Sequence, residues 1–107
     1  MLITFVTSAT ARNLSPVEKC DTVGRLSELI MNSRQEGMAR EAIEEVFLTD
    51  KTREANLLGL SRSLIDLAYQ RPIVPARQRG AVIERFVGAH IMTCWRAVDG
   101  RAPFDKP

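Results

Sequence analysis

Residues 76–99 read ARQRGAVIERFVGAHIMTCWRAVD and contain the clearest periodic pattern in the chain. Apolar and small residues recur there at helical spacing, so that they fall within a narrow arc of an α-helix. The residues of that arc are Ala76, Gly80, Ile83, Phe86, Val87, His90, Ile91, Cys94, Ala97 and Val98. Pro75 and Gly100 stand where a proline opens a helix and a glycine ends one. The stretch therefore predicts a long amphipathic helix over residues 75–99 with one buried face.

The upstream part of the chain carries an equally clear helix start. Ser15 fits an N-cap, Pro16 fits the first helical position, and Glu18 closes a capping box with the serine. Gly37 is the expected C-terminal stop, so this helix should run to about Gln35. Its expected apolar face consists of Cys20, Val23, Leu26, Leu29 and Ile30.

Two further helical stretches lie between these two helices. One covers residues 38–48, and the other covers residues 51–70, where the Arg71-Pro72 pair would end it. Residues 72–75 read PIVP and predict a stiff, extended connector. The apolar stripe expected in the first stretch consists of Ala39, Ala42, Ile43, Val46 and Phe47.

Together these elements predict an all-α fold, a compact bundle of four to five helices in a single domain over residues 15–100. Residues 1–14 are expected to form a short extended N-terminal arm, because residues 2–6 (LITFV) favour a β-strand that has no partner strand. Residues 101–107 are expected to form a loose C-terminal tail.

Composition excludes several classes of protein. Hydrophobic residues make up 45% of the 107 residues and charged residues 26%, as in a globular domain. No apolar run approaches the roughly 18–20 residues that cross a bilayer, and two cysteines are too few for a disulfide-rich scaffold. Residues 2–6 and the following Ala9-Thr10-Ala11 mimic a signal peptide, but the run is short and no positive charge precedes it. We therefore expect a cytoplasmic protein that does not bind membranes.

Residues 51–65, KTREANLLGLSRSLI, suggest a function. This segment resembles the helix-turn-helix of bacterial DNA-binding domains. That motif has a small residue in its first helix, a glycine with positive φ at the turn and an N-cap before the second helix. Ala55, Gly59 and Ser61 stand at those positions. Apolar residues flank the glycine and recur beyond it, as the motif requires, at Leu58, Leu60 and Ile65.

The resemblance implies a small DNA-binding transcriptional regulator that acts as a homodimer on paired half-sites. Its second helix would lie in the major groove, where arginine and polar side chains contact bases and phosphates. Basic residues further along would contact the DNA backbone. The expected DNA-binding residues are Arg62, Ser63, Asp66, Gln70, Arg71, Arg77 and Arg79.

The alternative structure for this segment is one continuous helix over residues 51–70. Its apolar residues would then cover a broad arc, as in a central helix surrounded by its neighbours. Gly59 would lie in the middle of that helix, at a cost of about 1 kcal/mol relative to alanine. The two structures differ at residues 59–61, where the DNA-binding motif needs a turn.

The distribution of charge supports a second function. The formal net charge is +2, but residues 71–107 carry seven basic and three acidic side chains. Such a region suits an acidic partner, and exposed arginine, tryptophan and methionine are enriched at protein interfaces. The alternative function is a non-enzymatic helical protein–protein interaction module, such as an anti-activator, an adaptor or an immunity protein. Its expected contact residues are Arg77, Arg85, Met92, Trp95 and Arg96.

No pattern in the chain indicates catalysis. His90 and Cys94 lie four residues apart, which suits two metal ligands, and Cys20 could supply a third. His90 and Cys94 belong to the apolar arc, however, and no CxxC or HxxxH pair accompanies them. A glycine-rich phosphate loop, a pair of catalytic carboxylates and a nucleophile elbow are also missing from the sequence. We therefore expect no metal, no cofactor and no catalytic residue.

Overall fold

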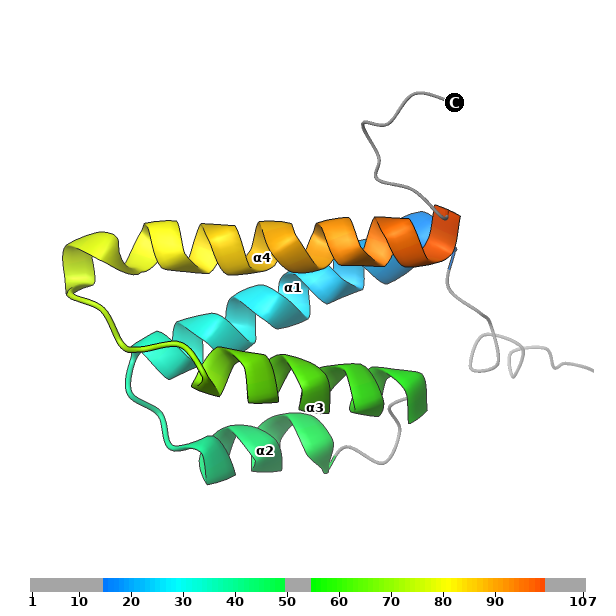
Figure 1. Ribbon diagram of the computed structural model, residues 1–107. Helices are drawn as coiled ribbons and strands as arrows, with labels where there is room; N and C mark the ends of the chain where they lie inside the picture. Colours follow the sequence, from blue (N-terminus) through cyan, green and yellow to red (C-terminus); the bar gives the residue numbers. More distant parts are fainter. Residues whose placement is uncertain (1–14, 50–54, 100–107) are drawn as a thin grey trace, which may run out of the picture.

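The computed structural model describes residues 15–49 and 55–99, and within these ranges it contains four helices and no strand (Figure 1). The helices are α1 (Pro16–Gln35), α2 (Arg40–Leu48), α3 (Ala55–Tyr69) and α4 (Ala76–Asp99). The predicted all-α bundle is confirmed. The expected N-terminal arm over residues 1–14 and the expected tail over residues 101–107 lie outside the described residues.

The ends of α1 are those that the sequence predicts. The Ser15 hydroxyl accepts a hydrogen bond from the Glu18 backbone N–H, and the Glu18 carboxylate accepts one from the Ser15 N–H, at 3.1 and 2.9 Å. Beyond the last turn, Gly37 has a φ of 85°, which a residue with a side chain rarely adopts. These local signals depend on neighbouring residues alone, which is why the sequence reveals them.

The buried face of α1 differs in part from the expected one. Leu29 is 54% exposed, so its predicted place on the apolar face is wrong. Gly24 and Ser27 are buried instead, because these small residues let the neighbouring helices approach closely. A Cβ atom added at Gly24 would lie 2.9 Å from Cδ1 of Ile91 on α4. The buried face of α1 therefore includes small residues beside the larger Leu26, Ile30 and Met31.

Helix α2 begins at Arg40 and buries Ile43 and Phe47. Val46, which was expected on the same stripe, is exposed. The reason is that α2 packs mainly on α3 and only lightly on α1, so a narrow part of its circumference is covered.

Helix α3 is continuous, and the turn expected at residues 59–61 does not form. Gly59 is helical, and Gly37 is the positive-φ glycine of the described residues. Ser61 does not cap a second helix, because its side chain is fully buried in the middle of α3. Leu64, Ile65 and Ala68 are buried beyond it. The alternative of one continuous helix is therefore correct for residues 55–69, and burial of its apolar arc outweighs the cost of a mid-helix glycine.

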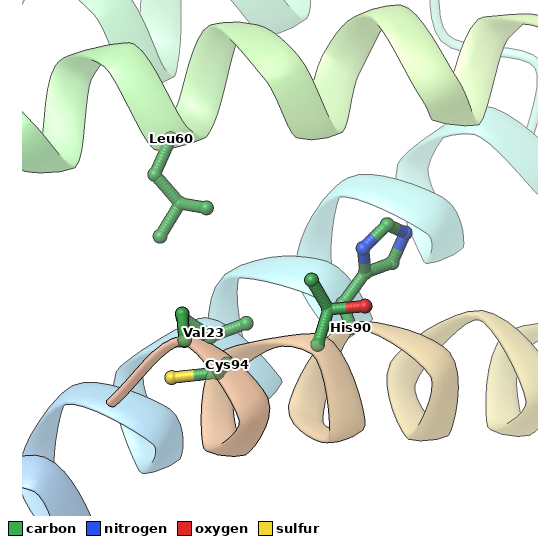
Figure 2. A pocket seen from close by; sticks show the side chains of 6 residues that line it. Val23, Leu60, His90 and Cys94 are labelled. Atoms are coloured by element: carbon green, nitrogen blue, oxygen red, sulfur yellow. The ribbon is translucent and has the colours of Figure 1, made fainter. Parts of the chain in front are cut away.

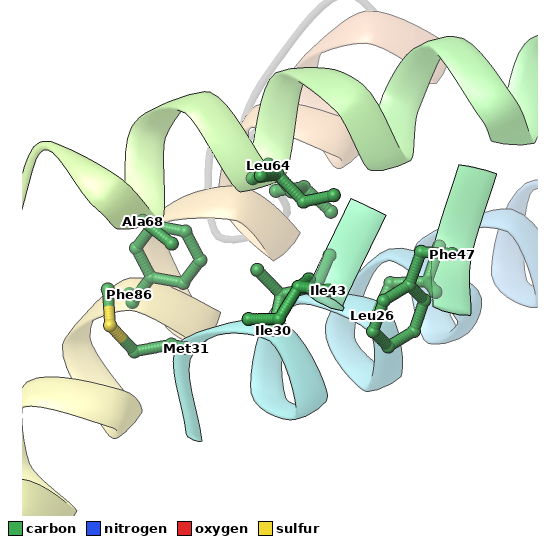
Figure 3. Packing of buried hydrophobic residues seen from close by; sticks show 9 residues of the cluster. Leu26, Ile30, Met31, Ile43, Phe47, Leu64, Ala68 and Phe86 are labelled. Carbon is green, nitrogen blue, oxygen red and sulfur yellow. The ribbon is translucent and has the colours of Figure 1, made fainter. Parts of the chain in front are cut away.

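The main core is a cluster of buried apolar side chains that pack together (Figure 3). The core cluster combines the later part of α1 with α2, α3 and a single turn of α4. Its residues are Leu26, Ile30, Met31, Ile43, Phe47, Leu64, Ile65, Ala68 and Phe86. Residues 16–25 of α1 and residues 87–99 of α4 contribute no member to it. We call these two segments the two-helix arm.

The two segments of the arm lie side by side, with the start of α1 next to the end of α4 (Figure 1). A disulfide joins Cys20 to Cys94 across them, with Cα atoms 5.5 Å apart. The sequence predicts that both cysteines lie on apolar helix faces, but it does not predict the bond between them. They lie on the facing sides of two paired helices, so the same apolar pattern that predicts burial also brings the two sulfur atoms together.

The connector between α3 and α4 is held by the last residues of α1. Gln35 is only 1% exposed. Its Nε2 donates to the Pro72 carbonyl at 3.0 Å, and its Oε1 accepts from the Val74 N–H at 2.9 Å. The Arg34 guanidinium donates twice to the Arg71 carbonyl, at 3.1 and 2.9 Å. These bonds fix the point at which the chain leaves α3 and enters α4.

Candidate interaction surface

The four residues of this segment that were expected to contact DNA are all exposed, but one of them is already paired with a side chain of α2. Arg62, Ser63 and Gln70 face away from the core. Asp66 forms an ion pair with Arg40 of α2, and Arg40 also donates to Glu44 at 2.9 Å. The Asp66 carboxylate therefore stabilises the contact between α2 and α3.

The three arginines that follow do not extend this surface. Arg71 lies in the connector, where its carbonyl accepts the bonds from Arg34. Arg77 is exposed, whereas Arg79 is half-buried and its Nε atom is buried without a hydrogen-bond partner. Two residues of separation on a helix place side chains about 160° apart, so Arg77 and Arg79 point to different sides of α4. The structure does not bring the seven candidate DNA-binding residues onto one face.

The residues expected to bind a protein partner lie on one side of α4. This helix packs along α1, and α1 is its principal partner among the described helices. The opposite side therefore faces none of the other described helices. By helical spacing it carries the outer face of α4, which we define as Arg77, Arg85, Met92, Trp95 and Arg96.

The arginines of this outer face are exposed, and the two apolar residues are half-buried. The partial burial of Met92 and Trp95 leaves part of each side chain available to a partner. The face extends about 28 Å along the helix axis, from residue 77 to residue 96. Glu84 borders it, so the three arginines leave the described part of this strip with a net positive charge.

A small pocket lies between α3 and α4, with α1 as its floor (Figure 2). We call it the α3–α4 pocket. Its volume is about 270 Å³, and Leu60 points from α3 toward Val23 and Cys94. Its lining residues are Val23, Leu60, His90, Thr93, Cys94 and Ala97. The lining is mostly apolar and contains no carboxylate or cationic side chain, so it offers no acid–base pair for catalysis.

His90 belongs to this pocket but not to a metal site. Its ring packs edge-on against Phe86, with ring centroids 4.4 Å apart. Burial lowers the pKa of the His90 imidazole below its ordinary value, and the charge of Arg71 lowers it further. The ring is therefore neutral at neutral pH. Cys94 is bonded to Cys20, and the described residues contain no cluster of three potential ligands for a metal ion.

Sequence reasoning missed the disulfide and the role of Gln35. A signal for the disulfide exists, because Cys20 lies near the start of the first helix and Cys94 near the end of the last. Antiparallel pairing of those helices would bring the two cysteines together. No comparable signal marks Gln35, since its partners are backbone atoms of a connector 37 and 39 residues away.

Comparisons with protein-family models, curated proteins and solved structures found no match to this chain. Separately, none of the described helices combines the length and apolar character needed to cross a membrane.

Proposed function

We propose that this protein is a non-enzymatic helical module that binds an acidic protein partner through the outer face of α4. The observation that carries the proposal is that this long helix packs against α1 on one side and faces no other described helix on the opposite side. Its free side presents three exposed arginines, Arg77, Arg85 and Arg96, beside half-buried Met92 and Trp95.

These residue types suit protein recognition. Arginine guanidinium groups bind carboxylates through paired hydrogen bonds, which fix orientation as well as charge. Tryptophan and methionine supply apolar area, and tryptophan and arginine carry much of the binding energy at many interfaces. A second copy of this chain is a poor occupant of the same face, because two net-basic strips repel each other. The predicted homodimer would have to form through another surface.

DNA binding is the less favoured candidate. The helix-turn-helix resemblance requires a turn at residues 59–61, and α3 is continuous there. Asp66, one of the expected groove contacts, is paired with Arg40. These observations support the interaction module over the DNA-binding regulator.

The disulfide also bears on the compartment. Disulfides persist in oxidising compartments and are rare in the cytosol, where thiols are kept reduced. The bond between Cys20 and Cys94 therefore favours an oxidising compartment over the cytoplasmic location that the sequence predicts.

The test is a charge reversal with a matched control. The test variant carries Arg85→Glu and Arg96→Glu on α4, and the control carries Arg25→Glu and Arg62→Glu on α1 and α3. All four arginines are exposed, so both variants change the net charge equally. Proteins retained from an extract of the producing organism are identified by mass spectrometry, and the affinity of the partner is then measured by calorimetry. We expect a loss of about tenfold or more for the α4 variant and little change for the control.

Equal losses in the two variants would contradict the proposal, since they would indicate a general charge effect. Duplex DNA is tested in parallel by fluorescence anisotropy at about 50 and 200 mM salt. Binding that falls steeply with salt and weakens in an Arg62→Ala variant would favour the DNA-binding regulator instead.

A further inference from the structure

We propose that Cys94 is a thiol–disulfide exchange site, which a small thiol reaches through the α3–α4 pocket, and that exchange there opens the two-helix arm. The inference concerns the disulfide and its surroundings, and it does not depend on which partner binds α4.

The two cysteines of the disulfide differ in exposure. Cys20 is 2% exposed. Cys94 is half-buried and lines the α3–α4 pocket, which has a volume of about 270 Å³ (Figure 2). The rate of exchange depends on which sulfur a thiolate can reach. We therefore expect the sulfur of Cys94 to be the one that a thiolate reaches.

The pocket suits a small thiol. Its volume is close to the lower end of the range found for small-molecule sites, which is about 300 Å³. Most of the lining is apolar, and Thr93 and His90 supply hydrogen-bonding groups at one wall. The lining contains no carboxylate that would repel an incoming thiolate.

The chemical step is a displacement at sulfur. The thiolate of a low-molecular-weight thiol attacks Sγ of Cys94 and forms a mixed disulfide there. The bond to Cys20 breaks, and its electron pair leaves on Sγ of Cys20, which takes a proton from water. A second molecule of the thiol can attack the mixed disulfide, which releases the oxidised small disulfide and leaves both cysteines reduced.

Loss of the disulfide should affect the arm far more than the rest of the molecule. The core cluster contains no residue from the arm. Within the arm, α1 buries Cys20, Val23 and Gly24, and no side chain of α4 from residue 87 to residue 98 is fully buried. Segments with little buried apolar area open locally at a small cost in free energy. The disulfide thus ties together two segments that pack closely at Gly24 and Ile91 but bury few side chains.

The first experiment locates the site of attack. Oxidised protein is incubated with reduced glutathione without denaturant, free thiols are blocked with N-ethylmaleimide, and the peptides are mapped by mass spectrometry. We expect glutathione on Cys94 and maleimide on Cys20. Glutathione mainly on Cys20, an equal distribution, or reaction only in denaturant would overturn the assignment of Cys94.

The second experiment tests the route through the pocket. A Leu60→Trp variant fills the pocket from α3, and Leu67→Trp, two turns along the same face of α3 and outside the pocket lining, is the matched control. We expect reduction to slow about tenfold in the first variant and by less than about twofold in the second. Thermal denaturation verifies that both are folded, and Ala97→Leu, on the opposite wall, replaces Leu60→Trp if that variant does not fold. Equal rates in the pocket variant and the control would exclude this route.

The third experiment follows the arm. Amide hydrogen exchange is compared for oxidised and fully reduced protein. We expect exchange to accelerate more over residues 16–24 and 88–98 than over residues 57–68 of α3, where it should rise only as far as the global free energy of unfolding falls. An equal acceleration in the arm and in α3 would show that the disulfide holds the whole fold, and unchanged protection in the arm would show that it does not need the disulfide. Either result would overturn the proposed opening of the arm.

Discussion

At the scale of single residues, Gln35 shows how one buried amide can determine a chain path. Its side chain donates to one carbonyl of the connector and accepts from an N–H two residues later. A neighbouring β-strand would pair with an extended segment in the same way, through one donor and one acceptor. Here the side-chain amide of Gln35 provides both groups. An extended connector with two prolines cannot form helical hydrogen bonds of its own, so it depends on this partner.

We expect Gln35→Leu to lower the free energy of unfolding by about 1–3 kcal/mol, because the variant leaves two connector groups without partners. Gln70→Leu is the matched control, since Gln70 is exposed and its side chain lies outside this network. Urea denaturation measures both. Similar values for the two variants would show that the connector does not depend on Gln35.

Prediction from sequence is weakest at this scale. Leu29 has the chemistry of a core residue and yet is exposed, whereas Ser27 and Gln35 are polar and buried. Their burial is decided by where the neighbouring helices cross α1, and that information is not local. Cys20 and Cys94 were correctly placed on apolar faces, but their bond depends on the register between two helices at opposite ends of the sequence.

At the scale of helices, the sequence predicts much more. The capping box at Ser15, the glycine at position 37 and the prolines at 72 and 75 give helix boundaries close to those observed. Each of these signals acts within a few residues, so no tertiary information is needed. The expected turn in α3 was wrong because the structure of this segment depends on tertiary contacts rather than on local signals. A glycine flanked by leucines fits either a turn or a helix, and burial against α1 and α2 decides for the helix.

The continuity of α3 predicts the effect of a single substitution. Gly59 is helical, and a Cβ atom there would meet nothing within 4 Å. We expect Gly59→Ala to raise the free energy of unfolding by about 1 kcal/mol, because alanine is the better helix former. Gly37→Ala, by contrast, forces a side chain into a positive-φ position and should be destabilising. If thermal denaturation showed Gly59→Ala to be destabilising as well, a turn at this position would have to be reconsidered.

At the scale of the whole molecule, the fold consists of a four-helix core and a two-helix arm tied by one disulfide. The core cluster draws on all four helices, while the outer face of α4 extends from the core side into the arm. Met92, Trp95 and Arg96 all belong to the arm. The orientation of these partner-binding candidates is therefore linked to the state of the disulfide.

Removing the disulfide should also lower the global stability. The bond joins residues 74 positions apart, so it greatly restricts the unfolded chain. We expect a Cys20→Ala, Cys94→Ala double variant to lose about 2–4 kcal/mol of unfolding free energy relative to the oxidised protein. Urea denaturation of the variant, the oxidised protein and the reduced protein provides the comparison. A variant as stable as the oxidised protein would contradict this expectation.

The division into core and arm has a spectroscopic consequence. The chain contains one tryptophan and one tyrosine. Tyr69 lies at the end of α3, where its hydroxyl donates to the Met38 carbonyl and the Arg34 guanidinium lies 4.8 Å from the ring centroid. Trp95 lies in the arm, next to Cys94 in the chain. Each part of the molecule thus carries its own intrinsic fluorophore, so that motion of the arm and melting of the core give separate optical signals from the unlabelled protein.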